Sequence, residues 1–224
     1  MKQANFVGKV SLVSVICFLL TIQVSFAQEN DEKQIKTTYQ EYIKAIKKHD
    51  GLKAVQCIDS KTIAHYDTIW NLIKTGDSVQ IAALSFTDMM TVLNFRQLFW
   101  QNNLDYKTFA DFDGASFFVF GIKLESMGSV EPPKWTLGEI SINGDFAQAQ
   151  CLDGRKELPV PIQFYKENNR WNFNLISLMD ILDDILEGII KQKGMPTQLF
   201  VLIVLDNKYG YGQVSPNIWK PIAE

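Results

Sequence analysis

Residues 135–177 read WTLGEISINGDFAQAQCLDGRKELPVPIQFYKENNRWNFNLIS, and this stretch decides the fold class. It contains three dipeptides that tolerate the positive φ angles required by tight hairpin turns: Asn143-Gly144, Asp153-Gly154 and Asn168-Asn169. Between these dipeptides apolar and polar residues alternate, as they do in strands that bury one face. The stretch therefore predicts an antiparallel meander of four strands, at residues 135–143, 145–152, 157–166 and 170–177.

Two prolines interrupt the third predicted strand. Pro159 and Pro161 occupy alternate positions near its start. Because proline has no N–H to donate to a neighbouring strand, we expect that side of the strand to lie at an edge or a bulge of the sheet.

Helices are predicted on both sides of the meander, because apolar residues recur there every three or four positions. Those before the meander cover residues 29–50, 52–74 with a break near 59–60, 86–101 and 105–125. Those after it cover 177–193 and a short segment beyond Pro196. Residues 116–124 and 200–205 could form strands instead. The sequence thus predicts an α+β fold, with N-terminal helices on a curved antiparallel meander and an extra C-terminal helical extension.

Two of the predicted helices begin with capping signatures. Ser85 and Asp88 form one such pair, and Ser177 and Asp180 form the other. The turn-rich end of the chain, residues 207–224, is expected to pack back on the fold as a strap.

The first 27 residues are typical of a cleaved secretory signal. Lys2 and Lys9 precede an apolar run at 10–24, and Ser25-Phe26-Ala27 has the small-x-small pattern of a cleavage site. The run is shorter than the roughly 20 residues that span a membrane, although an uncleaved anchor is the alternative. The prediction is therefore a protein exported to the periplasm or the extracellular space, with residues 1–27 removed.

The charge of the chain argues against a nucleic-acid partner. The sequence carries 22 basic and 25 acidic residues, and removal of residues 1–27 would take away two lysines and no acids. The remaining net charge of about −5 does not provide the basic surface that nucleic acids require.

Two cysteines lie beyond the predicted signal, Cys57 in a helical region and Cys151 in a strand. In an exported protein they could form one disulfide. They could equally be two separate buried thiols that act as small apolar side chains. The sequence leaves both possibilities open.

Helices followed by a meander resemble the nuclear transport factor 2-like superfamily of cone-shaped α+β domains. The likeness is carried by residues 39–46 (YQEYIKAI) and 50–54 (DGLKA) near the start, and by 145–149 (DFAQA), 161–167 (PIQFYKE) and 170–171 (RW) near the end. It implies a domain at 28–177, followed by a helical extension at 178–224 packed on the same domain. The chain differs from the superfamily pattern in two places. Helices enlarge the middle of the domain at 77–125, and the helical extension follows the last strand.

The superfamily hosts isomerases, cyclases and dehydratases as well as binding modules, so the fold alone does not assign a function. Its enzymes place an acid or a histidine inside the cone. His65 with Asp67 is the nearest candidate, with His65 as a general base oriented by the carboxylate. Residues two apart point to different sides of a helix, however, so a structural role is the simpler interpretation. No catalytic residue is assigned.

Other polar residues also have simpler interpretations than chemistry. Glu139, Gln148 and Gln150 could face a cavity, but alternation along strands places them on the solvent side. An acidic stripe could suggest a metal site, but a solvated helix face explains it, and no metal or cofactor is predicted. The stripe consists of Asp180, Asp183, Asp184 and Glu187.

The sequence therefore favours an exported, non-catalytic α+β protein that binds a small apolar ligand or a protein partner, including a second copy through the open face of the meander. The alternative is an isomerase- or hydrolase-like enzyme with its active site in the cone. The aromatic residues at 95–120 could line an apolar pocket, although core packing is the preferred interpretation.

Overall fold

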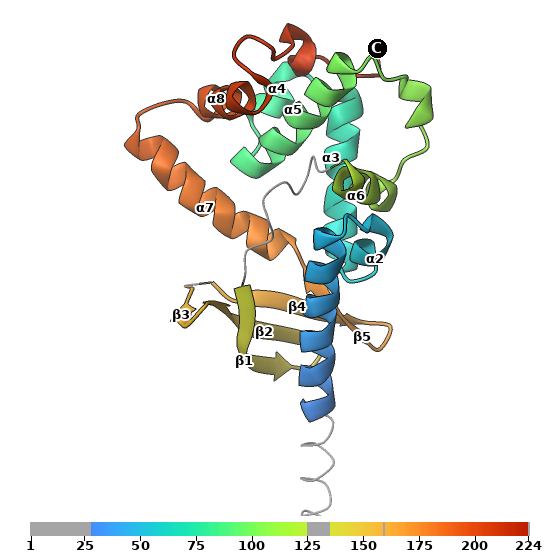
Figure 1. Ribbon diagram of the computed structural model, residues 1–224, viewed down its shortest axis with the longest axis vertical. Coiled ribbons are helices and arrows are strands. Elements are labelled where there is room, and N and C mark those ends of the chain that lie inside the picture. The colour runs from blue at the N-terminus through green and yellow to red at the C-terminus, as the bar shows by residue number, and fades with distance from the viewer. Residues whose placement is uncertain (1–27, 125–134, 159, 224) are drawn as a thin grey trace, which may run out of the picture.

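The protein is an α+β structure in which helices precede and follow a five-strand antiparallel sheet that does not close on itself (Figure 1). This confirms the predicted fold class. The computed structural model describes residues 28–124, 135–158 and 160–223. The predicted signal at 1–27 and Pro159 lie outside the described residues.

The helices before the sheet are a first helix at 28–47, α2 (Gly51–Val55), α3 (Ser60–Thr75), α4 (Ser78–Ala82), α5 (Phe86–Gln101), a 3-10 turn η1 (Tyr106–Thr108) and α6 (Gly114–Lys123). Those after the sheet are α7 (Ile176–Gln192), α8 (Thr197–Tyr209) and a second 3-10 turn η2 (Pro216–Trp219). Both segments that could have been strands, 116–124 and 200–205, are thus helical.

The sheet has the order β1-β2-β4-β5, and β3 extends the hairpin that it forms with β2. All strand pairs are antiparallel. The three predicted turns are present: Gly144 and Gly154 have φ angles of 60° and 63°, and Asn168 and Asn169 have φ angles of 51° and 62°. The strands are β1 (Trp135–Asn143), β2 (Phe146–Asp153), β3 (Lys156–Glu157), β4 (Ile162–Glu167) and β5 (Arg170–Asn174).

The prediction of one continuous strand at 157–166 is wrong. The structure has two strands there, β3 and β4, and Pro161 lies immediately before β4. Proline has no N–H to donate to a neighbouring strand, which is why an edge or a bulge was expected here. For the same reason the pairing with β2 is interrupted between β3 and β4 and resumes at Ile162.

The predicted cap at Ser177 is also wrong. β5 ends at Asn174 and α7 begins at Ile176, so Ser177 lies inside the first turn of the helix. The Asn174 Oδ1 accepts the Ser177 N–H at 2.8 Å, and the Ser177 Oγ donates to the Asn174 carbonyl at 2.8 Å. Asn174 therefore caps α7 from the end of the strand.

Capping explains the helix starts on the N-terminal side. α5 coincides with the predicted helix at 86–101, and the Ser85 Oγ accepts the Asp88 N–H at 3.3 Å. The sequence did not predict α4, where Asp77 accepts the Gln80 N–H and the Gln80 side chain accepts the Asp77 N–H. This reciprocal pair stabilises a five-residue helix.

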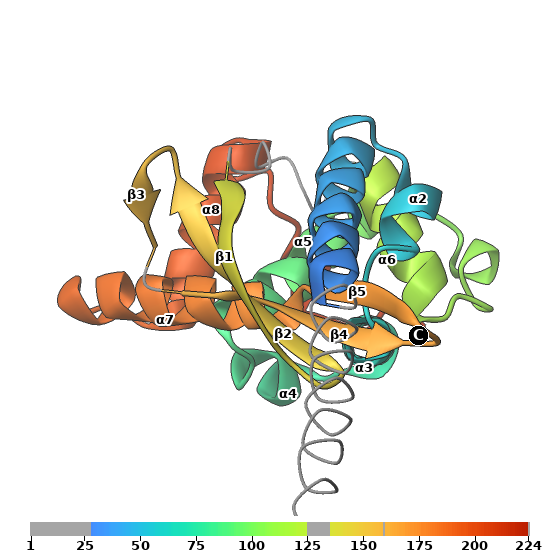
Figure 2. The same ribbon diagram turned by 90° about the horizontal axis from the view of Figure 1, so that it is seen from below.

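The elongated molecule has the sheet at one end and α4, α5 and α8 at the other, and α7 runs from the end of β5 towards α8 (Figure 1). The first helix lies along the sheet, as the view in Figure 2 also shows. Its Tyr39 and Tyr42 rings meet the Phe173 ring of β5 edge-on, with centroids 5.8 and 4.9 Å apart. The sheet thus has one face against helices, where Ala147 and Phe164 are fully buried.

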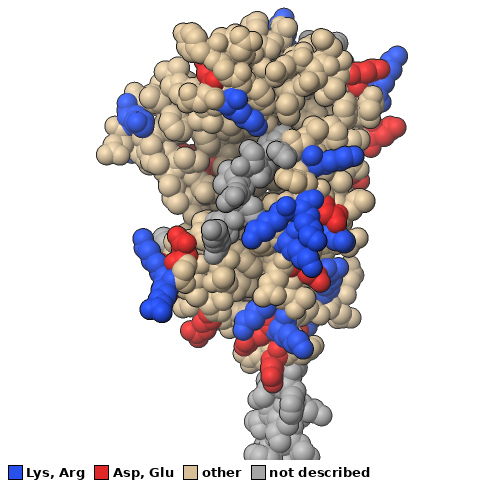
Figure 3. Space-filling model, in the orientation of Figure 1, with Lys and Arg blue, Asp and Glu red and all other residues tan. Residues whose placement is uncertain are grey.

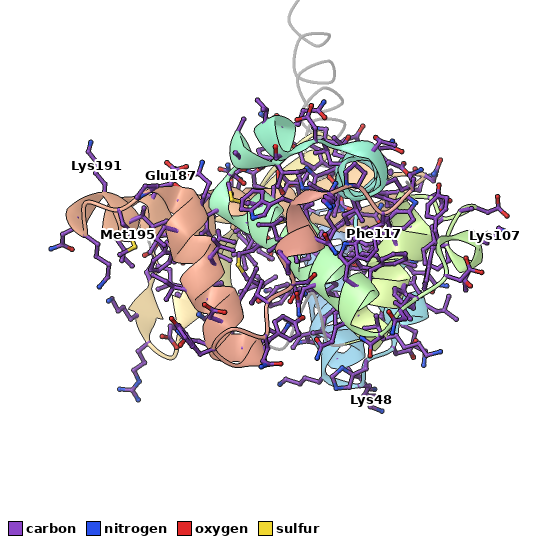
Figure 4. The ribbon with its side chains drawn as sticks, turned by 90° about the horizontal axis from the view of Figure 1, so that it is seen from above. Lys48, Lys107, Phe117, Glu187, Lys191 and Met195 are labelled. Atoms are coloured by element: carbon purple, nitrogen blue, oxygen red, sulfur yellow. The ribbon has the colours of Figure 1, made fainter. Side chains whose placement is uncertain are left out.

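A closed aromatic core joins α3, α5 and α6. The Trp70 ring stacks on Phe117 with centroids 5.2 Å apart, and Phe95 contacts both rings edge-on. Phe117 lies in the interior among densely packed side chains (Figure 4). Phe109, Phe112 and Phe120 complete this core. Core packing is therefore confirmed for these aromatic residues of 95–120.

The C-terminal strap packs back on the helices, as predicted, and a buried arginine holds it. Arg96 is fully buried on α5 and donates to the carbonyls of Leu72, Ile73, Gly76 and Ile218. The guanidinium thus binds carbonyls at and just beyond the end of α3 and joins that end to the strap. The domain boundary placed after residue 177 stays a prediction.

Candidate functional site

An apolar cavity of about 490 Å³ lies between the first helix and α7. The first helix contributes Tyr39, Tyr42, Ile43 and Ile46 to its wall. The opposite wall comes from α7, and α5, α6 and β5 also contribute residues. The α7 residues are Leu178, Met179, Leu182 and Leu186. The C-terminal extension is thus a wall of the cavity and leaves the space unfilled.

The polar side chains on the described lining are all uncharged: Tyr39, Tyr42, Tyr66, Thr87, Thr91 and Trp135. Burial raises the pKa of all three tyrosines well above the usual value, so these side chains stay neutral. In the described part of the chain no carboxylate, histidine or cysteine lines this cavity. The cavity therefore offers an uncharged, apolar environment.

A second hollow, the lysine groove, lies beside the cavity and has a similar volume of about 490 Å³. Its lining includes Lys36, Lys44, Lys47 and Lys48, all exposed on one side of the first helix and the turn after it. Lys and Arg side chains gather over this region of the surface (Figure 3). The last three lysines lie at the C-terminal end of the helix, where cations are favoured by the helix dipole. Their spacing from Lys36, at three- and four-residue intervals through Gln40, is the signal that could have revealed a basic face.

A third, smaller hollow of about 160 Å³ lies between α7 and the sheet, beside Cys151 and Ile162. Trp135, the first residue of β1, lines all three hollows. The lysine groove, the apolar cavity and the smaller hollow therefore all border one residue, Trp135.

The structure brings His65 together with Asp88 and places Asp67 elsewhere. The His65 Nε2 lies 3.0 Å from the Asp88 Oδ1, and the two side chains are 21% and 19% exposed. The Asp67 Oδ1 accepts the N–H of Gly114 at the start of α6. Neither His65 nor Asp88 is among the residues that line the cavity. His65 and Asp67 are separated because residues two apart point to different sides of a helix, as predicted. Asp88 lies on α5, so local spacing could not identify it as the partner of His65.

The acidic stripe of α7 has a structural role that sequence reasoning missed. The Asp183 carboxylate accepts the Thr87 N–H and the Thr87 hydroxyl, each at 2.7 Å, and so caps the first turn of α5. Asp184 and Glu187 are exposed, and Figure 4 shows Glu187 on the outer side of α7. Within the described ranges no three His, Cys, Asp or Glu side chains are grouped to hold a metal ion.

The polar strand residues face away from the cavity. Glu139 is exposed, and Gln148 and Gln150 alternate with the buried Ala147 and Ala149. The Gln150 Oε1 accepts the Glu139 N–H at 3.2 Å, where the register of β1 and β2 shifts. The solvent-side interpretation is confirmed for Glu139, whereas Gln148 and Gln150 are half-buried and Gln150 lines a separate open hollow of about 510 Å³.

The two cysteines are separate, buried free thiols. The Cys57 Sγ donates to the Lys53 carbonyl at 3.4 Å. Burial raises the pKa of both thiols, that of Cys151 to about 11. Of the two possibilities that the sequence left open, the structure has the pair of small buried side chains.

Comparison with protein-family models, curated proteins and solved structures finds no match to this chain. The resemblance to the nuclear transport factor 2-like superfamily therefore stays a prediction. Among the described residues no helix is both long and apolar enough to cross a membrane.

Proposed function

We propose that the protein is an exported binding protein that holds a small apolar ligand in the cavity between the first helix and α7, without catalysing a reaction. The observation that carries this proposal is the cavity itself. Its volume of about 490 Å³ falls within the range of about 300 to 1,000 Å³ that is usual for ligand sites. Export is supported by the signal pattern of residues 1–27.

The lining accounts for the expected preference for apolar ligands. Aromatic and aliphatic walls stabilise a bound hydrocarbon surface by about 25 cal/mol for each Å² that leaves water. A charged group inside would lose its hydration without gaining a counter-ion from the described lining. The Tyr66 hydroxyl can orient a ligand by a hydrogen bond. The Thr87 and Thr91 hydroxyls already donate within the protein, so they can only accept a hydrogen bond from a ligand.

The enzyme alternative has less support. An isomerase- or hydrolase-like reaction needs an acid or a base within hydrogen-bond reach of the substrate. The best candidate pair is His65 with Asp88, which adjoins Thr87 in sequence but does not line the cavity. A homodimer through the outer face of the sheet also stays a prediction, and light scattering of the purified protein would test it.

Fluorescence titration with the neutral probe N-phenyl-1-naphthylamine tests the proposed function. We expect saturable binding of one probe per chain. Leu182→Trp, which places an indole at the cavity wall, should lower the affinity at least tenfold. Ile189→Trp is the matched control, because Ile189 lies on the same helix, is equally exposed (38% against 39% for Leu182) and lines none of the described hollows.

Probe binding that is weak and non-saturable, or that both variants reduce equally, would contradict the proposal. Circular dichroism of the variants would establish that each one is folded.

A further inference from the structure

The lysine groove and the apolar cavity share a wall. Tyr39, Ile43 and Trp135 line both hollows. The two hollows therefore adjoin, and exposed lysines lie next to the apolar side chains of the cavity.

The charges of the groove are available to a ligand. Lys36 makes a long ion pair of 3.9 Å with Glu32 one turn away, which is a weak interaction at an exposed site. In the described part of the chain no ion pair engages Lys44, Lys47 or Lys48. These cations gather on one helix although acidic residues outnumber basic ones in the whole chain, 25 to 22.

The two environments together select the kind of ligand. A head group with a charge cannot enter the cavity, because no described group there would compensate the lost hydration. It must stay at the rim, where the lysines attract an anion and repel a cation. The smaller hollow beyond Trp135 shares Leu178 and Leu182 with the cavity and extends the apolar space for the end of a chain.

We propose that the ligand is a single-chain amphiphile with an anionic head group, whose hydrocarbon chain occupies the apolar cavity while the head group contacts the lysine groove. This inference rests on the proposed function and specifies its ligand. The described lining of the groove contains no arginine, so it lacks the planar fork that favours phosphate over other anions. The anionic charge is therefore the recognised feature of the head group.

Three probes with the same twelve-carbon chain test the inference: dodecanoate, 1-dodecanol and dodecyltrimethylammonium, each titrated by calorimetry below its micelle-forming concentration. We expect dodecanoate to bind at least tenfold more tightly than the ammonium probe, with dodecanol between them. Raising the salt concentration from about 0.01 to 0.15 M should narrow this difference, because it shortens the Debye length from about 30 to about 8 Å.

Lysine variants test whether the head group binds in the lysine groove. Lys44→Gln combined with Lys47→Gln should weaken dodecanoate binding about three- to tenfold and leave dodecanol binding unchanged. Lys191→Gln combined with Lys193→Gln is the matched control, because these exposed lysines lie at the end of α7 and Figure 4 shows Lys191 far from Lys48. The control should leave the affinity of all three probes unchanged.

The outcomes separate this inference from the proposed function. If the three probes bind with equal affinity, or if the two pairs of lysine substitutions have equal effects, the proposal of an anionic head group is wrong. The proposed apolar binding site would still be supported. If the ammonium probe binds best, the inference is likewise wrong. If none of the probes binds, both proposals fail.

Discussion

The closed aromatic core and the apolar cavity are built from the same kinds of side chain, yet one is filled and the other is hollow. The contrast is sharpest on α6, where neighbouring phenylalanines serve the two regions. Phe117 is fully buried against Trp70 and Phe95, whereas Phe118, 2% exposed, lines the cavity beside Tyr66. Residue type and burial are alike, so the arrangement of the surrounding helices makes the difference.

Polar contacts fix α7 at the far side of the hollow. Asn174 caps its start from the end of β5, and Asp183 joins its middle to the first turn of α5. Helix α7 is thus fixed by hydrogen bonds at positions that leave Leu182 and Leu186 facing open space. The closed core, by contrast, is held by direct contact between rings. Directional hydrogen bonds can therefore hold a cavity open where apolar contact alone would favour its collapse.

The largest expected effect on the free energy of unfolding comes from substituting the neighbouring phenylalanines of α6. Phe117→Ala should lower the free energy of unfolding by about 3–5 kcal/mol, as is usual for a large side chain lost from a packed core. Phe118→Ala should cost at least about 1 kcal/mol less, because one side of that ring already lacks packing partners. Urea denaturation of both variants measures the difference. Equal losses would mean that the cavity is packed like the core.

The next effect concerns the contact that fixes α7. Asp183→Ala should lower the free energy of unfolding by about 1–2 kcal/mol, because the Thr87 N–H and hydroxyl lose their acceptor. It should also weaken binding of the naphthylamine probe. Asp184→Ala, at the exposed neighbouring position, is the control and should change stability by less than about 0.5 kcal/mol. Unaltered probe binding in Asp183→Ala would show that this contact does not hold the cavity open.

A stabilising change is expected on the same helix. Gly188 lies within α7, and a Cβ there would meet no atom of the described residues within 4 Å. Gly188→Ala should therefore raise the free energy of unfolding by about 0.5–1 kcal/mol through helix propensity. Thermal unfolding checks this, and a loss of stability would indicate that α7 is not helical at this position.

The smallest effect depends on pH. Burial, followed by the nearby carboxylate of Asp183, raises the pKa of Asp180, although His65 opposes the shift. A folded-state pKa above the unfolded one means that ionisation of Asp180 destabilises the fold as the pH rises. Asp180→Asn should therefore stabilise the protein at pH 7, by no more than about 0.5 kcal/mol because solvent screens the exposed side chain. Below about pH 4 the gain should vanish. Equal gains at pH 3 and pH 7 would contradict this explanation.

Local patterns in the sequence predicted most of the secondary structure. The turn dipeptides place β1 and the hairpins, and Ser85 with Asp88 marks the start of α5. Prediction failed where a distant or competing contact decides the outcome. Asn174 replaces Ser177 as the cap of α7 because the strand and the helix are continuous there.

The candidate site was less predictable than the fold. The apolar stripe of the first helix and the residues of α7 were recognised as packing surfaces, but periodicity cannot tell a filled interface from a hollow one. Two of the contacts near the site join different helices: His65 with Asp88, and Asp183 with Thr87. Spacing along the sequence therefore cannot predict them. The basic face of the first helix is visible in the sequence, but the favourable position of cations at a helix C-terminus explains three of its lysines without a binding role.

Diffraction from xenon-pressurised crystals tests the difference between the two regions most directly, because xenon enters apolar cavities that are empty. We predict xenon density between the first helix and α7, beside Phe118 and Leu182, and none among Trp70, Phe95 and Phe117. Density absent from the cavity, with α7 packed against Tyr42 and Ile43, would contradict the central claim. So would xenon inside the aromatic core.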